Sequence, residues 1–154
     1  MRSTLNYVVQ DDGRDRGKIF VITEMSASQA EAWAMRAILA LIANGVDLPE
    51  NFESMGIAGL AELGIKALSK LKWTDAEPLL AEMWQCVRIM PDGAKPHVIR
   101  NLIEEDIEEI ATRIKLRAEI WKLHVGFLKA GALSISQEAP VAQPARSTKT
   151  SRQS

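Results

Sequence analysis

Two short runs of β-branched and aromatic residues lie near the start of the chain. They cover Leu5–Gln10 and Lys18–Thr23, and residues of this kind suit a pleated, half-buried surface. The segment between them, residues 11–17, is rich in aspartate and glycine, which favour turns. This pattern predicts an antiparallel hairpin whose loop is longer than the tightest turns. Because two strands alone are marginal in water, we expect a helix or further strands to cover the hairpin.

After the hairpin, apolar residues recur every three or four positions, which is the period of an amphipathic helix. Ser26 and Gln29 form a capping-box pattern at the first helix start, and Gly45 is placed to end that helix. Val98–Ile103 fits either a short strand or a lead-in to the last helix. Four helices are predicted in total, over about Ala27–Asn44, Met55–Leu71, Thr74 to just before Pro91, and Asp106–Lys129.

The last part of the chain changes in composition after Gly131, which is a plausible end for the last helix. Residues 134–154 contain two prolines, many serines and threonines, and almost no large apolar side chain. Such a segment cannot bury enough surface to offset its ordering entropy, so residues 132–154 are predicted to be a disordered polar tail. Residues 1–131 are then predicted to form a single domain of the α+β class, mostly α.

Composition and charge agree with an ordinary globular domain. The chain has 154 residues, of which 47% are hydrophobic and 25% are charged, and its formal net charge is -1. This charge provides no general attraction to nucleic acid or to an anionic membrane. The single cysteine, Cys86, cannot form an intramolecular disulfide, which fits a reducing compartment. Neither a secretory signal nor a membrane-spanning stretch is predicted.

Candidate chemical groups are few and scattered. His97 follows a proline in a predicted loop, whereas His124 lies among apolar helix residues and is expected to be packed. Cys86 is expected to be a small buried apolar residue. The acidic cluster Glu104–Glu109 lacks the spacing of a calcium loop and is expected to be a solvated helix start. We therefore predict no catalytic residue, metal site or cofactor, and no enzymatic activity.

The last predicted helix has two apolar faces. Ile107, Ile110, Ile114 and Trp121 lie on one face. The other face is a candidate partner-binding surface, made of Leu116, Ile120, Leu123 and Phe127. A surface helix of a monomer needs only one apolar face, so two alternatives stay open at this point. Either the helix is central in its own fold, or one face is covered by another protein or a second copy of the chain.

Two segments carry a resemblance to a known family. They are residues 17–33, which lead from a strand into an Ala/Leu-rich helix, and residues 116–127, with the sequence LRAEIWKLHVGF. Together they resemble the tail assembly chaperones of tailed bacteriophages, and the resemblance extends over Leu5–Leu128. It implies a non-enzymatic protein of the host cell cytoplasm that binds the tape-measure protein and helps recruit tail tube subunits. The family has no catalytic motif whose residues could be transferred.

Two other functions also fit the sequence. One is a structural head–tail connector or tail-completion protein of the virion. The other is a small regulator that binds nucleic acid, although the basic residues are interspersed with acidic ones except in the tail.

Overall fold

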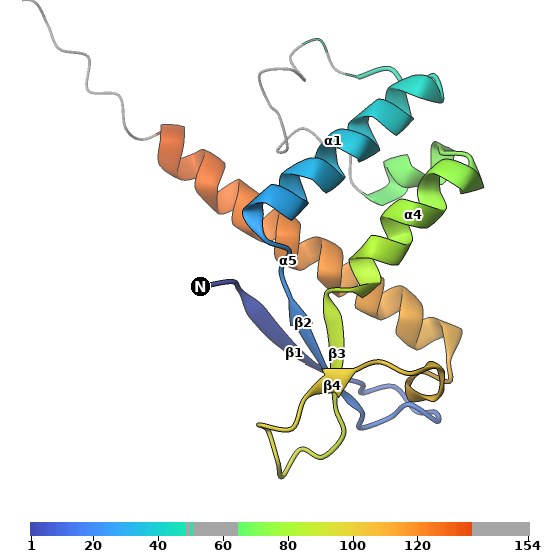
Figure 1. Cartoon of the computed structure of the whole chain (residues 1–154), viewed down its shortest axis with the longest axis vertical. Coiled ribbons are helices and arrows are strands. Elements are labelled where there is room, and N and C mark those ends of the chain that lie inside the picture. Colours follow the sequence, from blue (N-terminus) through green and yellow to red (C-terminus); the bar gives the residue numbers. More distant parts are fainter. Residues whose placement is uncertain (49, 51–64, 137–154) are drawn as a thin grey trace, which may run out of the picture.

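A computed structural model of the chain describes residues 1–48, 50 and 65–136, with the backbone alone at residues 65, 66, 68 and 125–136. Within this part of the chain, a four-stranded antiparallel sheet packs with three α-helices (Figure 1). The strands follow one another across the sheet in chain order, as β1 (Thr4–Val8), β2 (Ile19–Thr23), β3 (Val87–Met90) and β4 (Arg100–Asn101). The helices are α1 (Ala27–Ala43), α4 (Trp73–Trp84) and α5 (Ile110–Ser136), together with the 3-10 helices η1 (Ile65–Lys70) and η2 (Glu104–Asp106). The fold is therefore α+β, as predicted.

The N-terminal hairpin is confirmed. β1 and β2 pair from Thr4 opposite Thr23 to Val8 opposite Ile19. β2 is also bonded to β3, so it lies inside the sheet, and its Phe20 side chain is fully buried. The expected cover for the hairpin thus includes further strands as well as helices.

Helix α1 has the predicted ends. The Ser26 side chain accepts a hydrogen bond from the backbone N–H of Gln29 at 3.3 Å. At the other end Gly45 adopts a positive φ of 75°, and the N–H of Val46 bonds to the carbonyl of Leu41. This is the Schellman arrangement, which satisfies the last carbonyls of a helix.

The third predicted helix is too long, which is a correction. It begins one residue earlier than expected, at Trp73, and ends at Trp84, while Val87–Met90 forms strand β3. Val87 and Ile89 are buried and Arg88 between them is exposed, so this segment follows the two-residue period of a strand. The apolar residues from Leu79 to Val87 recur at helical spacing, so the sequence did not show where the helix ends. The pairing of β3 with β2 places Val87 in a strand.

Three further boundaries differ from the prediction. The predicted helix Met55–Leu71 lies mostly outside the described residues, and its described end is the 3-10 helix η1. The last helix begins at Ile110, after η2, and continues past Gly131 to Ser136. The predicted tail beyond that residue, 137–154, lies outside the described part. Among the described helices, none combines the length and the apolar character that a membrane crossing requires.

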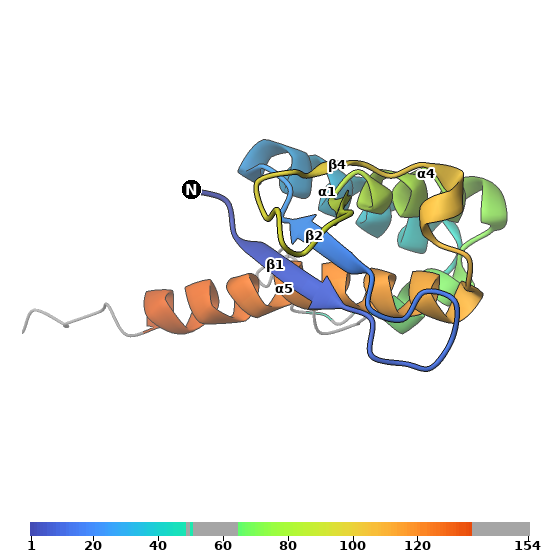
Figure 2. The same cartoon turned by 90° about the horizontal axis from the view of Figure 1, so that it is seen from below.

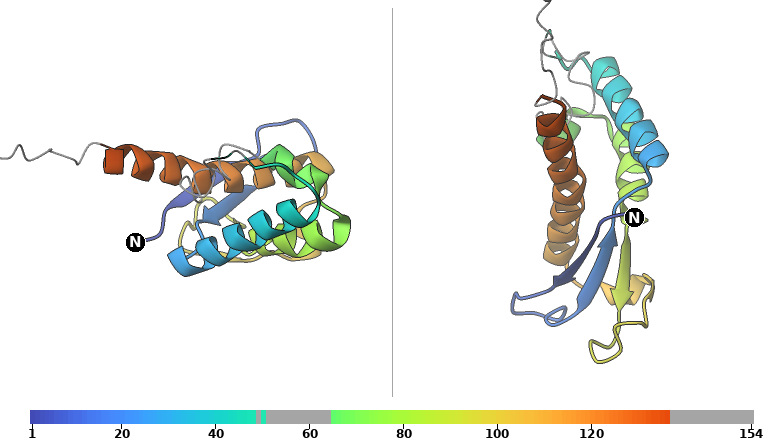
Figure 3. Two further views of the ribbon diagram at one scale, coloured as in Figure 1. Left: turned by 90° about the horizontal axis from the view of Figure 1, so that it is seen from above. Right: turned by 90° about the vertical axis from the view of Figure 1, so that its left-hand side faces the viewer.

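The core forms where α5 meets the sheet and the other helices. Figure 2 shows α5 running along one face of β1 and β2, and Figure 3 shows it continuing to the level of α1 and α4. Trp33 of α1 and Trp121 of α5 meet edge to face, with ring centroids 6.1 Å apart. The Trp33 indole N–H donates to the carbonyl of Leu79 in α4 at 3.0 Å. α5 is therefore a central element of the fold.

Candidate functional site

The start of α5 is fixed by the loop between β1 and β2. Asp15 in this loop is fully buried. Its carboxylate accepts hydrogen bonds from the backbone N–H groups of Glu108 and Glu109, each at 3.0 Å, and from Lys18 Nζ at 2.7 Å. An anion at a helix N-terminus satisfies free N–H groups and complements the helix dipole. Asp15 therefore holds the two residues directly before α5, although it lies more than 90 residues away in the sequence.

The protonation of this pair follows from its contacts. Burial alone would raise the pKa of the Asp15 carboxyl, but the bonds from Lys18 and from the backbone of Glu108 outweigh it and lower the pKa to about 2. Burial opposes the charge of Lys18 as well, yet the carboxylates of Asp15 and Glu108 raise the pKa of its ammonium. Both groups are thus charged near neutral pH.

A second ion pair holds the segment before α5. The Arg100 guanidinium donates two bonds of 2.7 Å to the two carboxylate oxygens of Asp106, a fork-to-fork geometry. The Arg100 bond lowers the pKa of the Asp106 carboxyl. This corrects the expectation that the acidic cluster Glu104–Glu109 is simply a solvated helix start, because Asp106 is buried and Glu108 pairs with Lys18.

The predicted partner-binding face is mostly core. Leu116 and Ile120 are 0% and 1% exposed, and Leu123 is partly buried against the same core. The side chain of Phe127 lies outside the described residues. The partner surface expected at Leu116 and Ile120 is therefore corrected: the chain covers this face with its own core, including Phe20 and Ile22. This face of the helix thus lies inside the chain's own fold, which accounts for one of its two apolar faces.

The other predicted face of α5 is the one that is open. Ile110 and Ile114 are 78% and 59% exposed, and Trp73 at the start of α4 is 66% exposed. Beside them is a depression of about 440 Å³ between η1, α4 and α5. We call it the α4–α5 groove, and it is lined chiefly by Leu71, Trp73, Leu80, Ile114, Arg117 and Ala118.

Arg117 of α5 lines this groove, and Arg113 lies one turn earlier on the same helix; both are near the ring of Trp84. The guanidinium carbon of Arg113 lies 4.2 Å from the centre of the Trp84 ring, and that of Arg117 lies 5.8 Å from it. Both distances are within cation–π range. Neither guanidinium forms an ion pair with any carboxylate in the described part of the chain.

Arg117 is the more constrained of the two arginines. Its Nε atom is buried and has no hydrogen-bond partner among the described residues. Burial and the nearby charge of Arg113 lower the pKa of the Arg117 guanidinium. A buried donor without an acceptor costs about 1–3 kcal/mol, so this position favours a ligand that supplies one.

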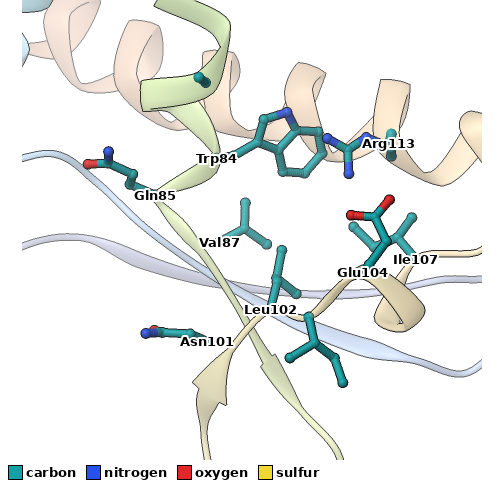
Figure 4. A pocket seen from close by; sticks show the side chains of 10 residues that line it. Trp84, Gln85, Val87, Asn101, Leu102, Glu104, Ile107 and Arg113 are labelled. Atoms are coloured by element: carbon teal, nitrogen blue, oxygen red, sulfur yellow. The ribbon is translucent and has the colours of Figure 1, made fainter. Parts of the chain in front are cut away.

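A second depression, of about 560 Å³, opens on the other side of Trp84. Figure 4 shows Trp84 and Arg113 side by side at its upper edge, with Val87, Leu102 and Ile107 beneath them. The Glu104 carboxylate points into the same space, but no ion pair connects it with Arg113 in the described structure. Trp84 and Arg113 thus belong to the lining of this second depression, which is more polar than the α4–α5 groove.

An exposed apolar stripe also runs along α1. Met35, Leu39 and Ile42 lie on one face of the helix and are each at least half exposed.

The two histidines and the single cysteine show no arrangement for catalysis within the described residues. His124 accepts the backbone N–H of Met25 at Nε2 and bonds through Nδ1 to the carbonyl of Ile120, so it is packed, as predicted. Cys86 is buried, which raises the pKa of its thiol to about 11, and His97 is exposed. Within the described residues, no cluster of histidine, cysteine and acidic side chains has a geometry suited to a metal ion.

Comparisons with protein-family models, with curated proteins and with solved structures give no match for this chain. Trp73, Trp84, Arg113 and Arg117 were not singled out from the sequence. One signal pointed to Arg117: it lies three residues after Ile114 and seven after Ile110, which is the spacing of a single helical face.

Proposed function

We propose that this chain is a tail assembly chaperone of a tailed bacteriophage, which binds the tape-measure protein and assists tail tube assembly without catalysis. The observation that carries the proposal is the α4–α5 groove, with the exposed Trp73, Ile110 and Ile114 at its border. The resemblance of residues 17–33 and 116–127 to this family supports it independently.

The shape and chemistry of the groove suit a helical client. A groove between two helices receives the apolar face of a third helix, whose anchors recur at three or four residues. Ile110 and Ile114 are one turn apart on α5 and open to solvent. Burying an isoleucine completely stabilises a complex by about 1.5–3 kcal/mol, and the large tryptophan adds to this. In this proposal the chain works in the host cytoplasm, with the tail tube protein as a second partner.

Co-expression with the tape-measure protein of the same phage tests the proposal. The wild-type chain is expected to keep the client soluble and to elute with it in size-exclusion chromatography. Ile114→Glu places a charge in the groove and is expected to reduce the recovered complex by about tenfold. Val98→Glu is the matched control, because Val98 is also exposed but lies in the loop between β3 and β4.

The result that contradicts the proposal is an insoluble client with no complex in the presence of the wild-type chain. Mass spectrometry of purified particles provides a second test. A chaperone is expected to be absent from the finished particle, whereas a stoichiometric amount there would point to a connector or tail-completion protein.

A further inference from the structure

We infer that the α4–α5 groove selects a helical partner segment that carries an acidic side chain, and that Arg117 and Arg113 receive its carboxylate. This inference rests on the proposed function, because it concerns the same groove, and it specifies the chemistry of the partner there.

The first argument is the unmatched charge of the two arginines. Elsewhere in the described structure, Arg14, Arg36 and Arg100 contact carboxylates. Arg2 and Arg88 form no ion pair with a described residue either, but they do not stand beside a second arginine on a helix. Arg113 and Arg117 have no such partner in the described part, although they lie one turn apart on a single helix. Like charges at this spacing repel each other, so an anion that approaches both is favoured. This local excess of positive charge is complementary to an acidic side chain.

The second argument is the state of the Arg117 side chain. Its buried Nε has no acceptor among the described residues, and its guanidinium carbon lies 5.8 Å from the centre of the Trp84 ring. A planar guanidinium presents parallel N–H groups that match a carboxylate in two-point contact. Because the Arg117 side chain is already partly buried, less conformational entropy is lost when the carboxylate binds.

The third argument concerns the neighbouring acid. Glu104 is near Arg113 in the second depression, but no ion pair is formed, and Arg117 belongs to the lining of the α4–α5 groove instead. No carboxylate of the described residues is therefore placed to pair with Arg117. Leu80 and Ile114 surround Arg117 with apolar side chains. This mixed lining suits a helix with both apolar and acidic residues better than a nucleic acid, which needs a longer run of cations.

The test uses two short synthetic peptides with the same amphipathic leucine stripe. One carries glutamate beside the stripe and the other carries glutamine at the same positions. Binding to the full chain is followed by fluorescence anisotropy of the labelled peptide. We expect the glutamate peptide to bind about tenfold more tightly, as for a charge-assisted pair worth about 1.4 kcal/mol. The preference is expected to shrink when NaCl is raised from about 50 to about 500 mM.

Variants connect this preference with the two arginines. Arg117→Gln is expected to bring the two affinities within about twofold of each other, and Arg113→Gln to have a smaller effect in the same direction. Arg117→Lys keeps the charge and is expected to retain part of the preference. Arg88→Gln is the control, because Arg88 is an exposed arginine on β3. Thermal unfolding of each variant verifies that it is folded. If Arg117→Gln does not fold, Arg113→Gln provides the test, because Arg113 is the more exposed of the two arginines.

Several outcomes would overturn the inference: equal affinities for the two peptides, an unchanged preference in the arginine variants, or no binding of either peptide. A dimer of the chain that Arg117→Gln dissociates would assign the groove to a second copy instead. Failure here is distinguishable from failure of the proposed function. If Arg117→Gln still captures the tape-measure protein normally, the proposed chaperone function is retained. The inference that the groove selects an acidic side chain is then wrong.

Discussion

At the scale of single residues, Asp15 shows how a buried charge can hold distant segments together. Its carboxylate binds Lys18 in its own loop and the backbone of Glu108 and Glu109 at the start of α5. Glycine at position 13 helps the loop to approach α5, because a Cβ there would lie 2.5 Å from a Glu109 oxygen. One acid thereby determines where the last helix begins relative to the hairpin.

Replacing Asp15 is expected to weaken the fold and to change its acid sensitivity. The pKa is about 2 in the folded chain and ordinarily 3.8, so the unfolded state binds the proton first as the pH falls. The stabilisation from ionised Asp15 is therefore complete above about pH 4 and is lost as the pH approaches 2. Asp15→Asn is expected to reduce the free energy of unfolding at pH 7 by about 2–3 kcal/mol. Urea titrations between about pH 2 and pH 7 measure both effects.

Asp12→Asn is the control for this prediction. Asp12 is in the same loop but is exposed, and it pairs with Arg16 at the surface. Surface pairs of this kind contribute little, so a change below about 1 kcal/mol is expected. Equal losses in the two variants would show that the buried contacts of Asp15 have no special role.

At the scale of elements, α5 is an apolar helix with two faces that meet different surroundings. The face with Leu116 and Ile120 packs against the sheet, and the face with Ile110 and Ile114 remains open beside α4. The guanidinium groups of Arg113 and Arg117 lie near Trp84 of α4. The sequence pattern identified both faces but did not distinguish which of them the chain itself would cover.

Truncation of one residue on each face is expected to separate folding from binding. Leu116→Ala removes a fully buried side chain and is expected to lower the free energy of unfolding by about 2–5 kcal/mol. Ile114→Ala removes an exposed side chain and is expected to change it by less than about 1 kcal/mol, while it weakens client binding. Chemical denaturation followed by circular dichroism measures the first quantity. Similar losses of stability in both variants would mean that Ile114 belongs to the core.

At the scale of the whole molecule, the two ends of the described chain depend on each other. β2 lies against α5, and the backbone N–H of Met25, just after β2, is bonded to His124 of α5. Without α5, the buried Phe20 and Ile22 would lose the packing provided by Leu116 and Ile120. Long-range contacts of this kind make the fold cooperative, so neither the hairpin nor the helices are expected to be stable alone.

Two truncations test this dependence. A chain that ends at Glu109 lacks α5 and is expected to show no cooperative thermal unfolding. A chain that ends at Ser136 lacks only residues for which the sequence predicts a polar tail without structure, and its melting temperature is expected to stay within about 4 °C of wild type. Cooperative unfolding of the shorter chain would contradict the central role of α5. A large decrease in the longer one would contradict the predicted tail.

Local signals account for the elements that the sequence predicted well. Two runs of β-branched and aromatic residues on either side of an Asp/Gly-rich loop specify the hairpin, and Ser26 with Gly45 specifies the two ends of α1. These features depend on neighbours a few residues apart, so the sequence alone contains them. The absence of a recognisable set of catalytic residues was also an inference from the sequence, and it stays a prediction.

Only the tertiary structure decided the features that join distant residues. Val87–Met90 becomes a strand because β2 offers its edge, although the same residues fit the end of a helix. Leu116 and Ile120 become core because the sheet covers them, which leaves Ile110, Ile114 and the two arginines to form the candidate site. The physical reason is the same in both cases. The spacing of apolar residues indicates which face of an element is buried. Which other element packs against that face depends on the contacts that give the lowest free energy for the whole chain.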